Sequence, residues 1–153
     1  MKAFVTRYAI LLTVLAVTAS SFYFFSSREE LSSLCPQARS TVSAPEKYSQ
    51  MKNILTPTKE NIEAGKALFN SRAQPIPCSI CHGFKGNSIG VIFQWIKPYA
   101  RNFTCYQTMR DISDGQMFWI IRNGSHGTRM RAYEKLDDEQ IWQLVLYLRS
   151  FTE

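Results

Sequence analysis

The stretch Pro75–Gly86, PIPCSICHGFKG, places two cysteines close together and a histidine directly after the second. Cys78 and Cys81 are separated by two residues, so their sulfurs can act on the same partner, and His82 adds a nitrogen donor beside them. Such a cluster is found in structural disulfides, in redox-active dithiols, in half of a zinc site, and in the anchor of a larger bound group. The rest of the sequence has to separate these readings.

Covalent haem attachment fits the cluster best. A redox-active dithiol needs a helix N-terminus beside a strand–helix–strand pattern, and no such pattern is recognisable in the sequence. A zinc site needs a further pair of ligands, whereas Cys35, Cys105 and His126 are isolated. Two cysteines at this spacing form thioethers with two vinyl groups on one porphyrin edge, and the adjacent histidine then lies under the ring. The motif therefore predicts one covalently attached haem c.

The second axial ligand of the iron is expected downstream of the motif. Met117 falls within a helical apolar stripe and is read as a core residue. Met130 lies in the glycine-containing segment NGSHGTRMRAY, which can fold a thioether over the ring. Met130 is the predicted ligand, and Met109 and His126 remain alternatives.

Composition and charge indicate a globular protein with one ordinary domain and some additional chain. The 153 residues are 45% hydrophobic and 20% charged. The net charge is +6, and residues 1–57 and 58–153 each carry three of these excess positive charges. Because no dense basic run occurs, nucleic-acid binding is not expected, and a mild preference for acidic partners is.

The N-terminus has the pattern of an export segment. Lys2 and Arg7 precede an uncharged run that extends to Ser27. Small residues up to Ala19 favour a cleaved signal, whereas the following SFYFF lengthens the run enough for an uncleaved membrane anchor. Both fates export the remainder of the chain, so we expect it on the periplasmic side of the inner (cytoplasmic) membrane, anchored, or soluble after cleavage. Residues 1–27 are thus assigned to a signal or anchor helix, and the polar residues 28–57 to a linker.

The sequence pattern of residues 58–153 predicts helices separated by long loops. Thr58 is a candidate N-cap for a helix over 58–70. Ser113 and Gln116 have the spacing of a capping box at the start of a second helix, which Gly124 is expected to end. Asp137 and Gln140 have the same spacing at the start of a third helix over 137–151. Three short helices give a thin core. A large apolar cofactor would supply the missing apolar contacts.

The region 58–153 resembles the class I monohaem cytochromes c. The resemblance rests on GKALF, CSICHG, IKPYARNF, RNGSHGTRM and LVLYLRSF. It implies an all-α fold of three to four helices around a covalently bound haem, here preceded by the N-terminal hydrophobic helix. It also implies that the first and last helices of the domain cross, with Gly65 and Phe69 facing Leu144 and Tyr147.

The resemblance further implies roles for individual residues. Cys78 and Cys81 would attach the haem, and His82 and Met130 would bind the iron. Pro98 matches the family's loop proline, whose carbonyl accepts the hydrogen bond of the ligand histidine. The residues considered for contact with the haem propionates are Arg101, Trp95 and Tyr99.

Three features depart from the family pattern. The segment between Phe69 and Cys78 is longer than usual. Arg131 and His126 occupy positions where the family commonly has prolines, so the backbone conformation of the loop that carries Met130 is less restricted before folding. Cys35 and Cys105 lie outside the pattern; they either pair with each other in an oxidising compartment, remain free, or in the case of Cys35 link to another chain.

The function expected from these residues is electron transport and not enzymatic catalysis. An iron held by His82 and Met130 has no vacant position and would shuttle single electrons between respiratory or dehydrogenase partners. Basic residues in the loops could steer a partner with an acidic docking surface, namely Lys85, Lys97, Arg129 and Arg131. The alternatives are a fixed haem subunit of a membrane-bound redox complex and a haem sensor or enzyme with a labile methionine ligand.

Overall fold

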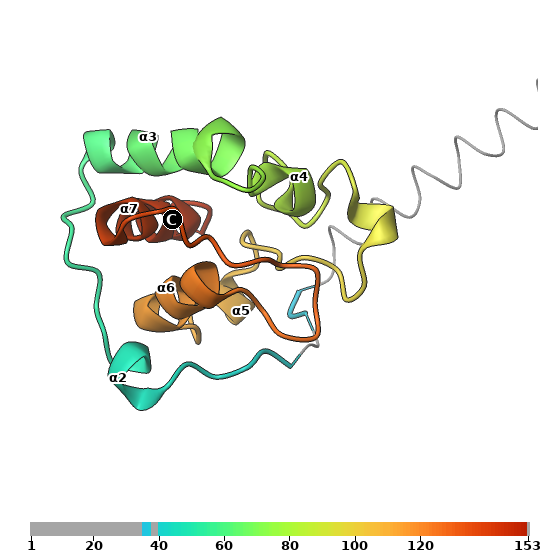
Figure 1. Cartoon of the computed structure of the whole chain (residues 1–153), viewed down its shortest axis with the longest axis horizontal. Helices are drawn as coiled ribbons and strands as arrows, with labels where there is room; N and C mark the ends of the chain where they lie inside the picture. The colour runs from blue at the N-terminus through green and yellow to red at the C-terminus, as the bar shows by residue number, and fades with distance from the viewer. Residues whose placement is uncertain (1–34, 38–39, 153) are drawn as a thin grey trace, which may run out of the picture. The chain divides into compact units, whose positions relative to one another are not determined.

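Two helices from opposite ends of the predicted domain cross at a glycine. In the computed structural model, which describes residues 35–37 and 40–152, α3 (Lys59–Ala67) packs against α7 (Asp138–Arg149) (Figure 1). A Cβ atom on Gly65 would lie 2.1 Å from the carbonyl oxygen of Gln143, so only glycine permits this approach. Beside the crossing, the rings of Phe69 and Tyr147 meet edge to face with centroids 5.4 Å apart. The predicted crossing is confirmed.

The three predicted helix starts are formed by side-chain caps. Thr58 caps α3 by accepting a hydrogen bond from the backbone N–H of Asn61, and Ser113 caps α6 (Asp114–Asn123) by accepting one from the N–H of Gln116. The capping box predicted at Ser113 is only half formed, because the Gln116 side chain binds the backbone of Val42 and Ala44 instead. At α7, Asp137 and Gln140 form the reciprocal capping box. Gly124 ends α6 at a φ of 76°, which is costly for other residues.

The described residues contain more helices than the three to four that the sequence predicts. Six α-helices are present, because α2 (Glu46–Ser49), α4 (Ser79–His82) and α5 (Tyr106–Met109) accompany the three longer ones. The chain also forms a π-helical segment at Leu68–Arg72 and a 3₁₀ turn at Phe93–Trp95. Each additional α-helix has only four residues, which is too short to produce a recognisable helical period.

The predicted N-terminal hydrophobic helix, residues 1–27, lies outside the described residues. Within the described part of the chain, no helix combines the length and the apolar character needed to cross a bilayer.

The polar segment that we predicted to be a linker packs against the helices. We call residues 35–37 and 40–53 the N-terminal strap. Its backbone lies so close to α6 that a Cβ on Gly115 would be 1.7 Å from the carbonyl oxygen of Tyr48, and the N–H of Gly115 donates to the Met51 carbonyl. The Tyr48 ring stacks on Phe118, with 6.4 Å between centroids. Many of these contacts use backbone atoms, so hydrophobic periodicity does not reveal them.

The core lies around α7, which packs against α3 on one side and against α6 on another. Its largest fully buried side chains are Trp142, Phe69, Met109, Ile141, Leu144 and Val145. Arg149, near the end of α7, fixes the start of α6 through an ion pair with Asp114 at 2.7 Å and hydrogen bonds to the carbonyls of Met109 and Ile112. One side of this core faces a cavity.

A larger side chain at Gly65 should separate α3 from α7. We expect Gly65→Leu to lower the free energy of unfolding of the haem-loaded protein by about 2–3 kcal/mol, because the obstructing atom is backbone and cannot rotate away. Chemical denaturation measures this loss. Lys66→Ala, at the exposed neighbouring position, is the control and should stay within about 0.5 kcal/mol of the wild type. Equal stabilities for the two variants would contradict the close crossing.

Candidate haem-binding site

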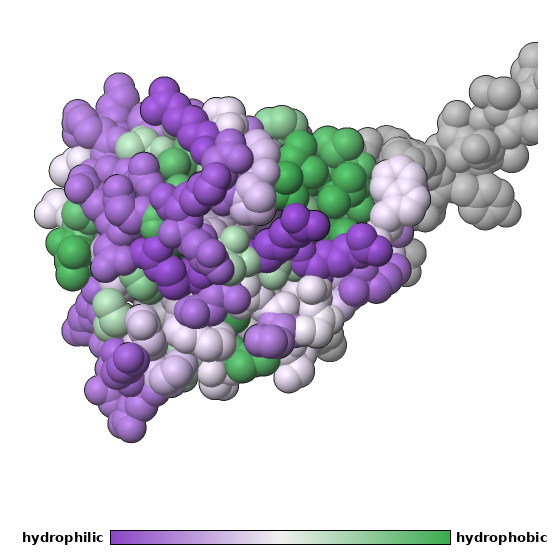
Figure 2. All heavy atoms as spheres, viewed as in Figure 1, coloured by the Kyte–Doolittle hydropathy of each residue, from purple (hydrophilic) through white to green (hydrophobic). Residues whose placement is uncertain are grey.

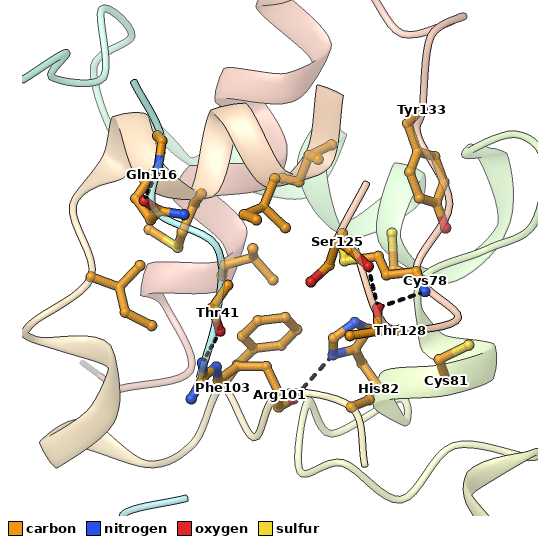
Figure 3. Close-up of a pocket in the computed structure, with 18 of the residues that line it drawn as sticks. Thr41, Cys78, Cys81, His82, Arg101, Phe103, Gln116, Ser125, Thr128 and Tyr133 are labelled. Atoms are coloured by element: carbon orange, nitrogen blue, oxygen red, sulfur yellow. Dashed lines mark hydrogen bonds between the residues drawn. The ribbon is translucent and has the colours of Figure 1, made fainter. Parts of the chain in front are cut away.

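One cavity is lined by all the site residues predicted from the sequence, and Figure 3 shows Cys78, Cys81, His82 and Arg101 around it. Its volume of about 690 Å³ lies within the range of roughly 300–1,000 Å³ usual for cofactor pockets. Residues of α4 and of the loop after α6 both line it. The predicted residues that line it are Cys78, Cys81, His82, Pro98, Arg101 and Met130.

The cysteine motif forms one tight helical turn. The N–H of His82 donates to the Cys78 carbonyl at 2.9 Å, and Gly83 ends the turn at a φ of 78°. The following loop packs against this turn so closely that a Cβ on Gly90 would lie 2.1 Å from the Ile80 carbonyl oxygen. The loop therefore fixes the turn that carries Cys78, Cys81 and His82.

The environment of the two free thiols does not suit a dithiol redox site. Burial raises the pKa of Cys78 to about 12 and also raises the pKa of Cys81. A reactive dithiol requires the opposite shift. Among the residues that the structure describes, no three side chains of histidine, cysteine, aspartate or glutamate are grouped to hold a metal ion. Two neutral thiols and an imidazole on a large cavity fit a haem, which uses all three.

His82 is oriented by a backbone carbonyl, and the acceptor differs from the predicted one. Its Nδ1 lies 3.0 Å from the carbonyl oxygen of Arg101, where the resemblance predicted the carbonyl of Pro98. Since Nδ1 carries one proton, a hydrogen bond to Arg101 occupies it and leaves the lone pair on Nε2, the atom that can bind a metal. The imidazole also stacks on Phe103, with centroids 4.5 Å apart.

The loop that carries Met130 is closed by its own hydrogen bonds. The Thr128 hydroxyl donates to the Ser125 carbonyl at 2.7 Å and accepts from the N–H of Met130 at 3.1 Å, while the N–H of Ser125 donates to the Met130 carbonyl (Figure 3). These bonds order a loop that lacks the family's prolines. His126 is exposed on it. Met109 and Met117 line the cavity as well, so position in the cavity alone does not select one methionine.

Arg101 and the N-terminal strap close one edge of the cavity. The Arg101 guanidinium donates to the hydroxyl of Thr41 at 2.9 Å, and both residues line the cavity. Trp95, in contrast, is 69% exposed, and the Tyr99 ring packs under the Lys97 ammonium. The strap begins at a disulfide between Cys35 and Cys105, which is the first of the alternatives for these two cysteines.

Sequence reasoning missed Tyr133. Its buried hydroxyl donates to the carbonyl of Ile76 at 2.8 Å, joining the chain after Met130 to the turn before Cys78. Burial, together with the nearby Cys78 thiol, raises the pKa of Tyr133, so it stays a neutral donor. No sequence signal marks this contact, because the acceptor is a backbone carbonyl.

Removal of the Tyr133 hydroxyl should loosen the turn before Cys78. We expect Tyr133→Phe to lower the free energy of unfolding of the haem-loaded protein by about 1 kcal/mol, since one hydrogen bond is lost. Tyr106→Phe removes the same atom from a ring that is 58% exposed and should have no measurable effect. Chemical denaturation of both variants tests this, and equal midpoints would show that the Tyr133 contact is energetically silent.

Comparison with known proteins identifies the family and the fold. Residues 60–148 match the family described as cytochrome c oxidase, cbb3-type, subunit III. No curated protein matches the chain. Among solved structures, a chain of the reducing HAO-like protein complex of Kuenenia stuttgartiensis has a similar fold, with a TM-score of 0.57 and 23% identity. The match covers 76% of this chain and 53% of that one, or about half its length. The family match spans more than half of the chain, and the protein belongs to this family of monohaem c-type cytochromes.

Proposed function

We propose that this protein transfers single electrons through one haem c whose iron is held by His82 and Met130. The observation that carries the proposal is the shared cavity, which is lined both by the Cys78–His82 turn and by the loop that carries Met130. When bound, the haem supplies an iron that alternates between the ferric and ferrous states. With His82 and Met130 both holding the iron, the protein would leave no position on it for a substrate.

Each cavity residue has a distinct part in this proposal. Cys78 and Cys81 would hold the haem covalently through their thiols, which burial keeps neutral. His82 presents Nε2, while the Arg101 carbonyl fixes its ring and increases its basicity. Met130 supplies a soft sulfur, which favours the ferrous state. The Arg101 guanidinium carries the positive charge that a propionate needs, and Pro98 contributes apolar lining.

The surface offers an apolar area and exposed cations for a redox partner. Figure 2 shows a hydrophobic area over α4, and the exposed large apolar side chains in the segment after α4 include Phe84, Val91 and Trp95. The four basic residues expected to steer a partner are all exposed: Lys85, Lys97, Arg129 and Arg131. We infer a partner with an acidic docking surface, because opposite charges accelerate encounter at low ionic strength.

The proposed location is the periplasmic side of the inner membrane. Support comes from Lys2 and Arg7, which precede the uncharged run of residues 8–27, and this run would act as a transmembrane anchor. An anchor would keep the haem domain near membrane-bound partners and raise its effective concentration there. A protein cleaved after the signal would diffuse freely in the same compartment.

A fixed subunit of a redox complex is the second candidate. It is favoured by the family description, which names an oxidase subunit, and by the structural neighbour, which is a component of a complex. Purification from membranes in mild detergent separates the candidates: a carrier is isolated alone, and a subunit is isolated with its partners. A haem sensor or enzyme with a labile Met130 bond is the third candidate.

The two cysteine pairs should differ in haem attachment. We expect haem to remain on the wild-type chain in a denaturing gel, and to be lost from Cys78→Ala/Cys81→Ala because no thioether can form. Cys35→Ser/Cys105→Ser is the matched control; it removes the disulfide and should retain the haem. Covalent haem on the Cys78→Ala/Cys81→Ala chain would contradict the assigned attachment site.

The methionine ligand can be tested by replacing the three candidates one at a time. In the oxidised protein, Met130→Leu should abolish the weak long-wavelength absorption band of a methionine–iron bond and should allow the reduced protein to bind carbon monoxide. Met109→Leu and Met117→Leu preserve side-chain volume and should keep the band.

Two results would contradict this assignment. A band that survives Met130→Leu and disappears with Met109→Leu or Met117→Leu would move the ligand to that residue. A wild-type protein without the band that binds carbon monoxide rapidly would favour the sensor or enzyme.

A further inference from the structure

We propose that Gln37 is a positioning residue for His82, and that the Cys35–Cys105 disulfide holds Gln37 in place. The proposal rests on His82 being the iron ligand of the proposed function. It concerns the carbonyl of Arg101, which accepts the Nδ1 hydrogen bond of His82 at 3.0 Å. What holds that carbonyl in position determines the geometry of the bond.

The Gln37 side chain binds the backbone on both sides of Arg101. Its Oε1 accepts from the N–H of Asn102 at 2.7 Å, and its Nε2 donates to the carbonyl of Ala100 at 3.1 Å. One amide group therefore fixes both peptide units that flank Arg101. The same Nε2 lies 3.1 Å from the hydroxyl of Ser88, whose hydroxyl also donates to the Ala100 carbonyl.

The disulfide closes this arrangement at its other end. Gln37 follows Cys35 by two residues, and Cys105 follows Asn102 by three, so the covalent bond and the amide contacts tie the same two short segments together. Cys35 and Cys105 are 70 residues apart in sequence. Without the disulfide, the contacts of Gln37 with the segment around Arg101 would have to offset the entropic cost of closing the long chain between them.

The consequence for the iron follows from the hydrogen bond of its ligand. A short, well-aligned bond from Nδ1 to a carbonyl makes an imidazole a more basic ligand, and a more basic ligand stabilises the ferric state. If Gln37 releases the backbone at Arg101, the bond weakens. The reduction potential should then become more positive.

The test uses the haem-loaded protein with Gln37→Leu, which preserves side-chain size and removes all three amide contacts. In the reduced protein, the Nδ1 proton of His82, followed by NMR, should exchange with solvent about tenfold faster, as expected for loss of one to two hydrogen bonds. The midpoint potential should shift in the positive direction. Cys35→Ser/Cys105→Ser should change both measurements in the same direction and serves as the second variant if Gln37→Leu is poorly folded.

Asn53→Leu is the matched control. Asn53 is also an amide in the strap, and its Nδ2 donates to the Trp142 carbonyl at 2.9 Å, away from Arg101. Loss of this bond should lower stability and leave proton exchange and potential unchanged. Unchanged exchange in Gln37→Leu, or equal changes in Gln37→Leu and Asn53→Leu, would overturn the proposal. Because the readout lies on the His82 side, it stays valid if Met130 does not bind the iron, a result that would contradict the proposed function only.

Discussion

The close approach of α3 and α7 at Gly65 is the contact on which the rest of the domain depends. The absent side chain lets the α3 backbone lie against the Gln143 carbonyl, and this brings Phe69 into the aromatic cluster with Phe103 and Tyr147. Phe103 in turn stacks on the His82 imidazole. The contact between the two helix backbones therefore determines the position of the aromatic rings that pack against His82. A larger distance between α3 and α7 would displace these rings.

The site is held mainly by backbone carbonyls. His82 donates to Arg101, and Tyr133 donates to Ile76. Carbonyl acceptors keep fixed positions only where their own segments are fixed, and here the strap, the disulfide and the Tyr133 contact supply that restraint. A covalent link and a strap that packs along α6 therefore add order to the part of the chain that faces the cavity.

Much of the site could be predicted because its chemistry depends on residue type and local spacing. The motif at Cys78, Cys81 and His82 and the loop residue Met130 all line one cavity, and the caps at Thr58, Ser113 and Asp137 are formed. The strap was not predicted, since its residues are polar and aperiodic and it docks through backbone atoms. The single-turn helices were missed because four residues do not complete a detectable period.

The sequence by itself determined the cofactor motif, the three longer helices and the glycine at the crossing of α3 and α7. Each of these features depends on the types of residues that lie close together in the sequence. Only the tertiary structure decided that the carbonyl of Arg101, and not that of Pro98, receives the proton of His82. It also decided that Cys35 pairs with Cys105 and that Gln37 binds on both sides of Arg101. The physical reason is that every residue carries the same carbonyl, so the choice among them depends on how distant segments meet in space.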